Sequence, residues 1–566
     1  MNANRASSTG RCTAERLRLV PKNINWVIWP CLAAAALFLL TAGAGSYPFL
    51  TSDEARHAGI VHNMWASRHY LVPRVGAFPV LDGAPLHYWI SLGFIEVFGA
   101  SEWALRLPSA LAAVALLLFV GKAFLPSGTW RLPLILTCLF LLQPALLMAG
   151  RFVAPDMLGL LLITVSLGSF WSAAQYLERG EWSTPWTFSA WVATALSGLA
   201  VGPLAILLPL VTVGLWLACR KRFDVIAALC WWPAMVAAAA LFVPWFWLVE
   251  HSYPGIVSAM LQRQALTLVG EGRHEWLELG AGSCWLLVAA GGLPLLVCCI
   301  CRYRDPGLRA AFRTPTAGLM AVWLLVSVLF HPLIALSPAG HAIAMVVPLL
   351  YFSALAMAPS EDGTHRVGGL CTWGAIGLLA VVIGAAGIYV FSKHPSAAAT
   401  LAHTVRQSYN PFTDKVIMLD RFDYDFNFHM KTPKLVYVAT DWATGENLAS
   451  LNWKRELSDS ARFVPDVAES LLLTAVPPAQ AAAPASLGPG HDSVADGVVE
   501  RLENSLFNRL CAQRSINLWV IGSKEAGARY PILSDLLPVV ISGQAYVWYL
   551  GVGTRPLRCT QRAQQH

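Results

Sequence analysis

Charged residues are scarce in this chain, and their scarcity excludes two broad classes of protein. Asp, Glu, Lys and Arg make up 13% of the 566 residues, whereas a soluble globular protein carries roughly 25%. A disordered chain is excluded as well, because it would be rich in charge and poor in aromatic residues, which make up 11% here. Apolar residues account for 56% of the chain, and its mean hydropathy is +0.54. The composition therefore predicts a polytopic membrane protein.

The basic excess does not indicate a nucleic-acid partner. The net charge is +7, but the lysines and arginines gather at the ends of apolar runs, as is typical of a membrane topology signal. The sequence therefore predicts membrane lipid, and not nucleic acid, as a partner.

Apolar runs long enough to cross a bilayer recur along the first two thirds of the chain. A span needs about 20 predominantly apolar residues. The fifth and sixth runs are short and are divided by Gly202-Pro203, so they could form one broken hairpin. The predicted spans are 25–46, 104–125, 132–149, 157–177, 187–200, 203–219, 225–249, 281–301, 315–335, 341–358 and 368–391.

Basic clusters predict the orientation of these spans. If the basic N-terminus (1–24) is cytoplasmic, the clusters at 122–131, 220–222 and 302–313 also fall on the inside, as the positive-inside rule requires. The segment 47–103 then forms a first outside loop. Residues 25–392 form the predicted transmembrane domain, and everything after about 392 faces outside.

The tail, 393–566, is long enough to fold as a domain of its own. Short β-rich runs alternate there with helical patterns, which predicts a small α/β unit. The composition of 476–491 predicts a flexible insertion. Cys511 and Cys559 are either a disulfide of an oxidising compartment or two free thiols. The β-rich runs are 415–419, 434–438, 517–522 and 545–550.

The first outside loop concentrates titratable groups directly after a span, in Thr51-Ser52-Asp53-Glu54-Ala55-Arg56-His57. One interpretation is structural, because Thr51 and Glu54 match a capping box and acids suit a first helical turn. The other is functional. Asp53 would take a proton from an acceptor hydroxyl or hold a cation opposite a phosphate, and Arg56 on the same helix face would keep it ionised.

A second carboxylate, Asp156, begins the fourth span on the same predicted side of the membrane as Asp53. It too could be a plain helix cap, since it follows Pro155. Acids near a bilayer edge are uncommon, so two on one side favour a functional role. Asp53 and Asp156 are the candidate ligands of a divalent metal, although two separated carboxylates are too few to predict one firmly.

Several pieces of the loop carry a family resemblance. The pieces are Asp53-Glu54-Ala55-Arg56, Tyr70-Leu71-Val72-Pro73-Arg74, Pro85-Leu86-His87-Tyr88-Trp89 and Glu102-Trp103-Ala104-Leu105-Arg106-Leu107-Pro108-Ser109. Together they resemble the first outside loop of the GT-C glycosyltransferases that use polyprenyl-phosphate sugars. That superfamily includes lipid A aminoarabinose transferases and protein O-mannosyltransferases. Further matches follow in family order at Arg151…Asp156, Gly202-Pro203, Ser337…His341…Pro348 and Asp420-Arg421-Phe422-Asp423-Tyr424.

The resemblance implies a fold and an activity. The fold is a polytopic α-helical membrane protein of GT-C type, with about eleven to thirteen transmembrane helices and a C-terminal periplasmic α/β domain. The activity is transfer of a hexosyl or pentosyl unit from a polyprenyl-phosphate donor to lipid A, another envelope glycan or a protein. The reaction takes place at the periplasmic face of a bacterial inner membrane, with inversion. Alternatives are a protein O-glycosyltransferase, a lipid-linked sugar flippase, and an inactive relative that binds polyprenyl lipid.

The family's catalytic acids map onto Asp53, Glu54 and Asp156. Three family lysines are absent: the chain has Gly83 and Val201 at two of their positions and lacks the third just before His341. A phosphate leaving group needs positive charge or a metal. Each candidate replacement for the lysines could equally be a snorkelling or headgroup-anchoring side chain. The candidates for binding the donor phosphate or substrate are Arg56, Arg74, His87, Tyr88, Arg151, Arg263 and His341.

Overall fold

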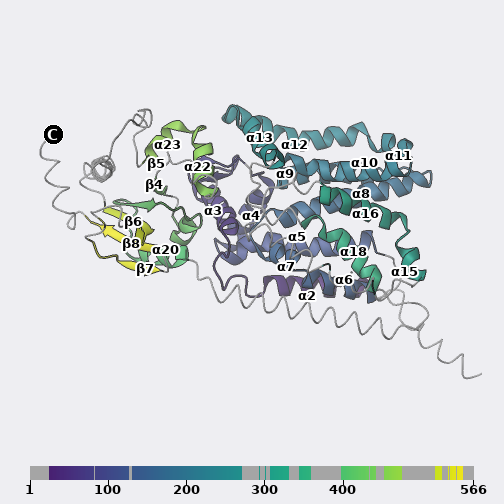
Figure 1. Ribbon diagram of the computed structural model, residues 1–566, viewed down its shortest axis with the longest axis horizontal. Coiled ribbons are helices and arrows are strands. Elements are labelled where there is room, and N and C mark those ends of the chain that lie inside the picture. The colour runs from purple at the N-terminus through teal and green to yellow at the C-terminus, as the bar shows by residue number, and fades with distance from the viewer. Residues whose placement is uncertain are drawn as a thin grey trace, which may run out of the picture. The chain divides into compact units, whose positions relative to one another are not determined.

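A computed structural model describes most of the apolar part of the chain and the sheet of its tail (Figure 1). The chain divides into two compact units. A helical unit comprises Met1–Ala44, Arg106–Pro244 and Gln264–Ser392, and a mixed unit comprises Gly45–Leu105, Trp245–Arg263 and Lys393–His566. The structure describes residues 25–81, 83–125, 131–269, 306–329, 343–357, 397–432, 434–440, 452–474, 517–525, 536–542 and 545–551, with positions 292, 300 and 533.

Helices lie at every predicted span that falls within the described residues. Three of them, α5, α8 and α12, are long and apolar enough to cross a membrane, and the bent pair α6 and α7 makes a fourth if it is counted as one span. The predicted spans 281–301 and 368–391 lie almost wholly outside the described residues. The helices are α2 (Asn25–Thr41), α5 (Glu102–Ala123), α6 (Arg131–Leu142), α7 (Pro144–Arg151), α8 (Asp156–Glu178), α9 (Thr184–Ala200), η2 (Pro203–Ile206), α10 (Leu207–Cys219), α11 (Phe223–Leu229), α12 (Trp232–Ser252), α15 (Pro306–Ala311), α16 (Pro315–Leu329) and α18 (Val346–Met357).

Two predicted spans are broken in the structure. The run 132–149 divides into α6 and α7, which meet at an angle of 72°. Pro144 is the first residue of α7, and its missing N–H cannot continue the hydrogen-bond ladder of α6. The run 225–249 divides at positions 230–231, between α11 and α12, again next to a proline, Pro233. Hydropathy does not report such breaks, because proline interrupts the backbone without lowering the apolar content.

Small residues let α8 and α9 approach closely. A Cβ at Gly159 would lie 2.0 Å from Cγ2 of Val201, so only glycine admits that side chain. Ser166 and Thr194 share a hydrogen bond of 2.6 Å between the same two helices. Close backbone approach and buried hydroxyl pairs are the usual means by which helices associate in lipid. Val201 is therefore a packing residue.

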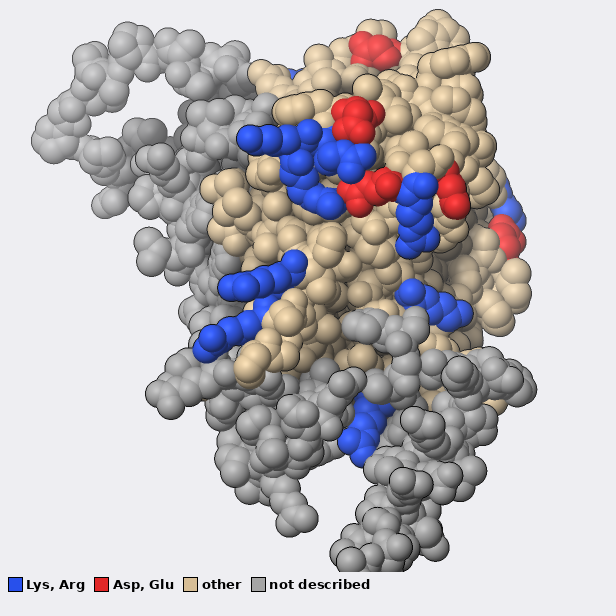
Figure 2. All heavy atoms as spheres, turned by 90° about the vertical axis from the view of Figure 1, so that its right-hand side faces the viewer, with Lys and Arg blue, Asp and Glu red and all other residues tan. Residues whose placement is uncertain are grey.

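Lysine and arginine side chains gather on the face of the molecule that lies at the right of Figure 1 (Figure 2). Three consecutive basic residues, Arg220, Lys221 and Arg222, join α10 to α11. Nη1 of Arg220 lies 2.7 Å from a carboxylate oxygen of Glu178 at the end of α8. The basic cluster predicted at 220–222 is therefore a loop between helices, as a topology signal requires.

The mixed unit begins with the first predicted outside loop. Its first helix, α3, contacts the helix α4, the strand β1 and the short helix α21 of the tail. Its elements before the tail are α3 (Ser52–Ser67), β1 (Arg74–Val75), β2 (Phe78–Pro79), α4 (Leu86–Phe98) and α13 (Ile256–Val269).

The tail contains a six-stranded sheet with strand order β5-β4-β3-β6-β8-β7. The four strands β5, β4, β3 and β6 are parallel, and β8 and β7 are antiparallel to their neighbours. Each predicted β-rich run overlaps a strand, so the predicted α/β fold of the tail is confirmed. The insertion 476–491, Cys511 and Cys559 lie outside the described residues. The tail elements are α20 (Ala397–Ser408), β3 (Asp414–Leu419), α21 (Phe426–Met430), β4 (Tyr437–Thr440), α22 (Asn452–Ala461), α23 (Pro465–Leu471), β5 (Leu472–Thr474), β6 (Asn517–Ser523), β7 (Val540–Ser542) and β8 (Ala545–Leu550).

Candidate functional site

Thr51 and Glu54 cap the N-terminus of α3, in a variant of the capping box. The N–H of Glu54 donates to Oγ1 of Thr51 at 3.1 Å, and the N–H of Leu50 donates to Oε2 of Glu54 at 2.8 Å. Glu54 is buried, with 1% of its surface exposed. Its carboxylate therefore holds the start of the helix. Asp53, its neighbour in the same first turn, is exposed and lies where the helix dipole favours a negative charge.

Arg56, one turn further along α3, is held by the tail of the chain. Its Nε donates to both carboxylate oxygens of Glu456, at 2.8 and 3.0 Å, and Nη2 donates to Oε1 at 2.6 Å. The hydroxyl of Tyr424 donates to Oε2 of the same carboxylate at 2.6 Å. Both charged side chains are nearly buried, with 11% of Arg56 and 5% of Glu456 exposed. This geometry fixes the guanidinium close to the helix turn that carries Asp53.

His57, on α3, and Tyr88, on α4, form a second buried pair. Nδ1 of His57 and the hydroxyl of Tyr88 are 2.9 Å apart. Gly83 leaves room for this tyrosine, since a Cβ there would lie 3.3 Å from its hydroxyl. His87 is 1% exposed, and burial lowers its pKa from 6.5 to about 4. His87 is therefore neutral at pH 7 and supplies no positive charge for a phosphate.

Two further predicted cations contact groups of the mixed unit. Nη2 of Arg74 donates to the hydroxyl of Tyr253 at 2.6 Å. Nη1 of Arg263, on α13, lies 3.9 Å from a carboxylate oxygen of Asp459 on α22. Asp53, Glu54, Arg56, Arg74, His87, Tyr88 and Arg263 thus all belong to one unit.

The remaining described candidates belong to the helical unit. Asp156 is the first residue of α8 and is half-buried. Arg151 donates from Nη1 and Nη2 to the carbonyl oxygens of Leu39 and Ala42, each at 2.8 Å. These carbonyls lie at the C-terminal end of α2, where backbone acceptors lack helical partners. Arg151 therefore caps α2, and His341 lies outside the described residues.

A metal site is not assembled within the part of the chain that the structure describes. No group of three or more His, Cys, Asp or Glu side chains there is arranged to hold an ion. Glu54, the nearest acid to Asp53 in sequence, is committed to the helix cap. Asp53 and Asp156 belong to different units, so a metal shared between them stays a prediction.

Sequence reasoning singled out Arg56 but missed Glu456 and did not single out Tyr424. The hydrogen bond between Arg56 and Glu456 joins residues 400 positions apart, a separation that hydrophobic periodicity cannot detect. A weak signal existed for Tyr424, which ends the family-like run Asp420-Arg421-Phe422-Asp423-Tyr424. Glu456 carried none, because a single glutamate in an amphipathic helix is typical of a solvated surface.

The chain is similar to known proteins both in sequence and in fold. Residues 71–259 match the family model of dolichyl-phosphate-mannose-protein mannosyltransferase. The chain is 26% identical over 195 residues to the undecaprenyl phosphate-alpha-4-amino-4-deoxy-L-arabinose arabinosyl transferase of Erwinia tasmaniensis, covering 34% of this chain. It is 25% identical over 205 residues to the enzyme of that name from Edwardsiella ictaluri. The matched region spans about a third of these relatives, 35% and 36% of their length.

The fold is similar to that of ArnT from Cupriavidus metallidurans. The apo structure of that protein matches with a TM-score of 0.63 at 16% identity, covering 94% of this chain and 99% of that one. Its structure bound to undecaprenyl phosphate matches with a TM-score of 0.61, covering 93% and 98%. The predicted resemblance is therefore confirmed: this chain has the polytopic membrane fold of ArnT and is similar in sequence to glycosyltransferases that use polyprenyl-phosphate sugars.

Proposed function

We propose that this chain is an integral-membrane glycosyltransferase that moves a sugar from a polyprenyl-phosphate donor to lipid A or another envelope acceptor. The observation that carries the proposal is the ArnT fold over 94% of the chain, joined to the mannosyltransferase match at 71–259. The names of the curated relatives favour an arabinosyl unit.

The proposed location is the periplasmic face of a bacterial inner membrane. The basic loop 220–222 supports a cytoplasmic position for the end of α10 that leads into α11. The first outside loop (47–103) and the tail (393–566) then lie in the periplasm. The boundaries 1–24, 25–392 and 393–566 stand as part of this proposal.

The proposed chemistry is a single displacement. The acceptor hydroxyl oxygen attacks the anomeric carbon, its proton passes to Asp53, and the bond from that carbon to the phosphate oxygen breaks. The exposed position of Asp53 in the first turn of α3 supports it as the base, because an acceptor hydroxyl can approach its carboxylate there. Displacement in one step inverts the anomeric centre.

The leaving polyprenyl phosphate keeps the electron pair of the broken bond and needs electrostatic stabilisation. Arg74 and Arg263 are the described cations of the mixed unit that we assign to this task, and Arg56 would contribute less because its guanidinium is already paired with the carboxylate of Glu456. Glu54 supports the site through the helix cap, and Tyr88 through His57. Asp156 would bind hydroxyls or an amine of the sugar. Arg151, His87 and His341 are the weaker members of the set, the first two because of the contacts and burial given above.

Replacing Asp53 by Asn tests the proposal. Purified protein in lipid is incubated with a panel of polyprenyl-phosphate sugars and lipid A, and a sugar-sized mass gain on the acceptor is followed by mass spectrometry. We expect Asp53→Asn to lower the transfer rate about 100-fold or more, the usual contribution of a general base. Asp224→Asn, which changes an exposed acid on α11, is the matched control and should keep the wild-type rate. Full transfer by Asp53→Asn would exclude Asp53 as the base.

Protein O-glycosylation is the second candidate function. The family matched at 71–259 is named for transfer of mannose to protein, which favours this alternative specifically. Adding serine- and threonine-rich peptides to the same assay separates the two, since a mass gain on peptide alone would replace lipid A as the acceptor. Lipid movement that persists in Asp53→Asn without any transfer would instead support a flippase.

A further inference from the structure

The first outside loop (47–103) contains three arginines, and they differ in their partners. Arg56 and Arg68 each pair with a glutamate. In the part of the chain that the structure describes, Arg74 contacts no carboxylate, and its Nη2 donates to the neutral hydroxyl of Tyr253 at 2.6 Å. Because a guanidinium does not lose its proton, Arg74 is the arginine of this loop whose charge is not compensated.

The guanidinium of Arg74 is half-buried and keeps one terminal nitrogen open. Nε is buried, whereas Nη1 stays in contact with solvent, and neither nitrogen has a hydrogen-bond partner among the described residues. The half-buried hydroxyl of Tyr253 accepts from Nη2, and a hydroxyl can donate at the same time as it accepts. Two donors, Nη1 of Arg74 and the hydroxyl of Tyr253, are therefore available to an anion that lies against both.

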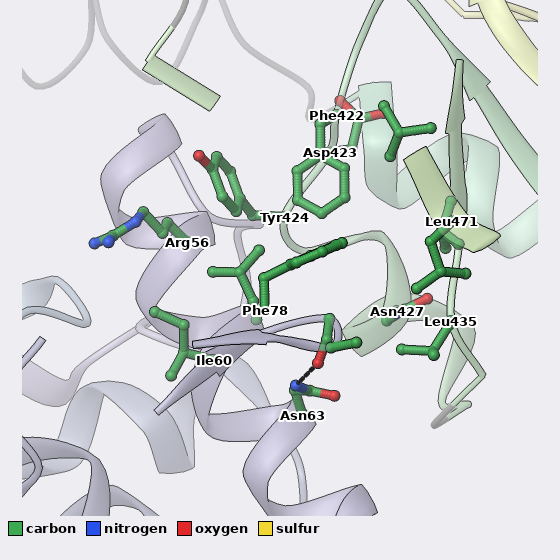
Figure 3. Close-up of a pocket in the computed structure, with 16 residues that line it drawn as sticks. Arg56, Ile60, Asn63, Phe78, Phe422, Asp423, Tyr424, Asn427, Leu435 and Leu471 are labelled. Atoms are coloured by element: carbon green, nitrogen blue, oxygen red, sulfur yellow. Dashed lines mark hydrogen bonds between the residues drawn. The ribbon is translucent and has the colours of Figure 1, made fainter. Parts of the chain in front are cut away.

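The β1–β2 hairpin holds the backbone of Arg74 in place. Nδ2 of Asn63, on α3, donates to the carbonyl oxygens of Arg74, at 3.1 Å, and of Gly76 (Figure 3). Asn63 is 9% exposed, so its amide has little access to competing water. The hairpin is thus fixed to α3 before any ligand binds, and this preorganisation lowers the entropic cost of binding.

The turn between α12 and α13 positions Tyr253. The carboxylate of Glu250 accepts from the N–H groups of Gly255, at 2.7 Å, and of Val257, at 2.9 Å, which ties the end of α12 to the start of α13. These backbone donors also engage the negative charge of Glu250. The turn therefore holds the phenol next to Arg74 without placing a competing carboxylate on the guanidinium.

Apolar side chains lie next to this pair. Nε1 of Trp245 donates to the carbonyl oxygen of Leu71 at 2.9 Å, which brings α12 beside the segment that leads to Arg74. Leu71 is 38% exposed, and Leu248, one turn after Trp245 on α12, is 40% exposed. Exposed apolar surface beside an uncompensated cation suits an amphiphile. A free anion would leave the leucines uncovered, and a neutral lipid would leave the guanidinium unpaired.

We propose that Arg74 and Tyr253 bind the phosphate group of a lipid. Nη1 and the phenolic hydroxyl donate to the phosphate oxygens, and the alkyl part of the lipid packs on Leu71 and Leu248. The proposal rests on the proposed function for the source of the phosphate, which is either the polyprenyl donor or lipid A. It supplies positive charge that Gly83, at the position of a family lysine, does not.

Native mass spectrometry of the full chain tests the site, with farnesyl phosphate as the probe and farnesol as its uncharged counterpart. We expect the wild type to bind farnesyl phosphate at least tenfold more tightly than farnesol, because only the phosphate pairs with the guanidinium. Tyr253→Phe keeps the ring and removes the donor. It should weaken the binding of farnesyl phosphate about tenfold, the scale of one hydrogen bond to a charged group. Arg74→Gln should weaken it further.

A second pair of arginine and tyrosine in the same loop provides matched controls. Nη1 of Arg68 donates to the hydroxyl of Tyr70 at 3.0 Å, but it also donates to the carboxylate of Glu96 at 2.8 Å. Arg68→Gln and Tyr70→Phe should therefore bind farnesyl phosphate as the wild type does. Melting temperatures without lipid detect a merely structural role, which would destabilise Tyr253→Phe and leave its affinity for the probe unchanged.

Undecaprenyl phosphate and lipid A, titrated separately, identify the source of the phosphate. Weaker binding to Arg74→Gln that is confined to undecaprenyl phosphate assigns the site to the donor, and weaker binding confined to lipid A assigns it to the acceptor. Equal affinity of the wild type for farnesol and farnesyl phosphate, or wild-type affinity in Arg74→Gln, would overturn the site. Binding that Arg74→Gln and Tyr253→Phe weaken, in a chain that transfers no sugar, would reject the proposed function and leave the site standing.

Discussion

Among single residues, the pair formed by Arg56 and Glu456 is the most consequential. The side chains of Arg56 and Glu456 are only 11% and 5% exposed, so these two opposite charges have lost most of their hydration. Their mutual hydrogen bonds, with the one from Tyr424, offset that loss. Removing one partner leaves an uncompensated buried charge, which is the costly case.

We therefore expect Glu456→Gln to lower the free energy of unfolding by about 3 kcal/mol. Thermal melts in a fixed detergent measure the effect. Glu96→Gln is the matched control, because Glu96 pairs with Arg68 at the surface, where 65% of the arginine and 50% of the glutamate are exposed. Exposed pairs contribute about 0–1 kcal/mol. Equal shifts for the two variants would show that the Arg56 pair is not buried.

Residue-level prediction succeeded where chemistry is local. Thr51 and Glu54 were recognised as a capping box from their spacing alone. The structure forms the bond from the Glu54 N–H to Thr51, while the Glu54 carboxylate accepts from the N–H of Leu50, one residue before the N-cap. Glu456 could not be recognised, because its role depends on a partner 400 positions away. The proposed catalytic roles of Asp53 and Asp156 stay predictions.

At the scale of one element, the face of α3 that meets the tail depends on a single glycine. The Cβ of an alanine at Gly59 would lie 2.2 Å from the Tyr424 carbonyl oxygen, a backbone atom that cannot move alone. We expect Gly59→Ala to lower the melting temperature, because the tail segment at Tyr424 must move away from α3 to make room for the added methyl group.

Gly93→Ala, in α4, is the control for Gly59→Ala. A Cβ at Gly93 meets nothing within 4 Å, so the helix gains only the better propensity of alanine. We expect a stabilisation of about 1 kcal/mol. Two variants with shifts of the same sign would contradict the close approach of Tyr424 to α3.

The sequence predicted helices and strands correctly where their residues form a clear local pattern. Apolar length predicted the helices, and β-rich runs predicted β3, β4, β6 and β8. The three-residue strands β5 and β7 are too short to show alternation. The breaks before Pro144 and Pro233 were missed because hydropathy averages over a proline without registering its lost N–H.

At the scale of the whole molecule, acid should weaken the mixed unit through His62. This side chain lies on α3 against the ring of Phe428, and burial lowers its pKa from 6.5 to about 4. Between pH 6.5 and about pH 4, the unfolded chain therefore binds a proton at His62 that the folded chain does not bind. Stability falls as the pH drops from about 7 to 4, by at most about 3 kcal/mol at 1.36 kcal/mol per pKa unit.

Melting temperatures measured from pH 7 to pH 4 check this expectation against His62→Leu. The variant has no group to protonate at this site, so its melting temperature should fall less over the same range. A wild-type curve parallel to that of His62→Leu would show that His62 is not buried as a neutral imidazole.

The composition of the mixed unit was the least predictable property. It joins Gly45–Leu105, Trp245–Arg263 and Lys393–His566, three segments separated by stretches of the helical unit. Sequence patterns assign the segment Gly45–Leu105 to a loop and the segment Lys393–His566 to a separate domain. That the three share one compact unit depends on long-range contacts such as Arg56 with Glu456 and Arg263 with Asp459.

Because the mixed unit is assembled from distant segments, it cannot form until its last segment has been synthesised. Translation adds roughly 5–20 residues per second, so Glu456, 400 positions after Arg56, emerges roughly 20–80 seconds later. Throughout that interval α3 is made but lacks the partner for its arginine and the backbone that covers Gly59. The N-terminal part of the mixed unit therefore waits for the tail, and it is during this wait that a chaperone or a quality-control protease would find it.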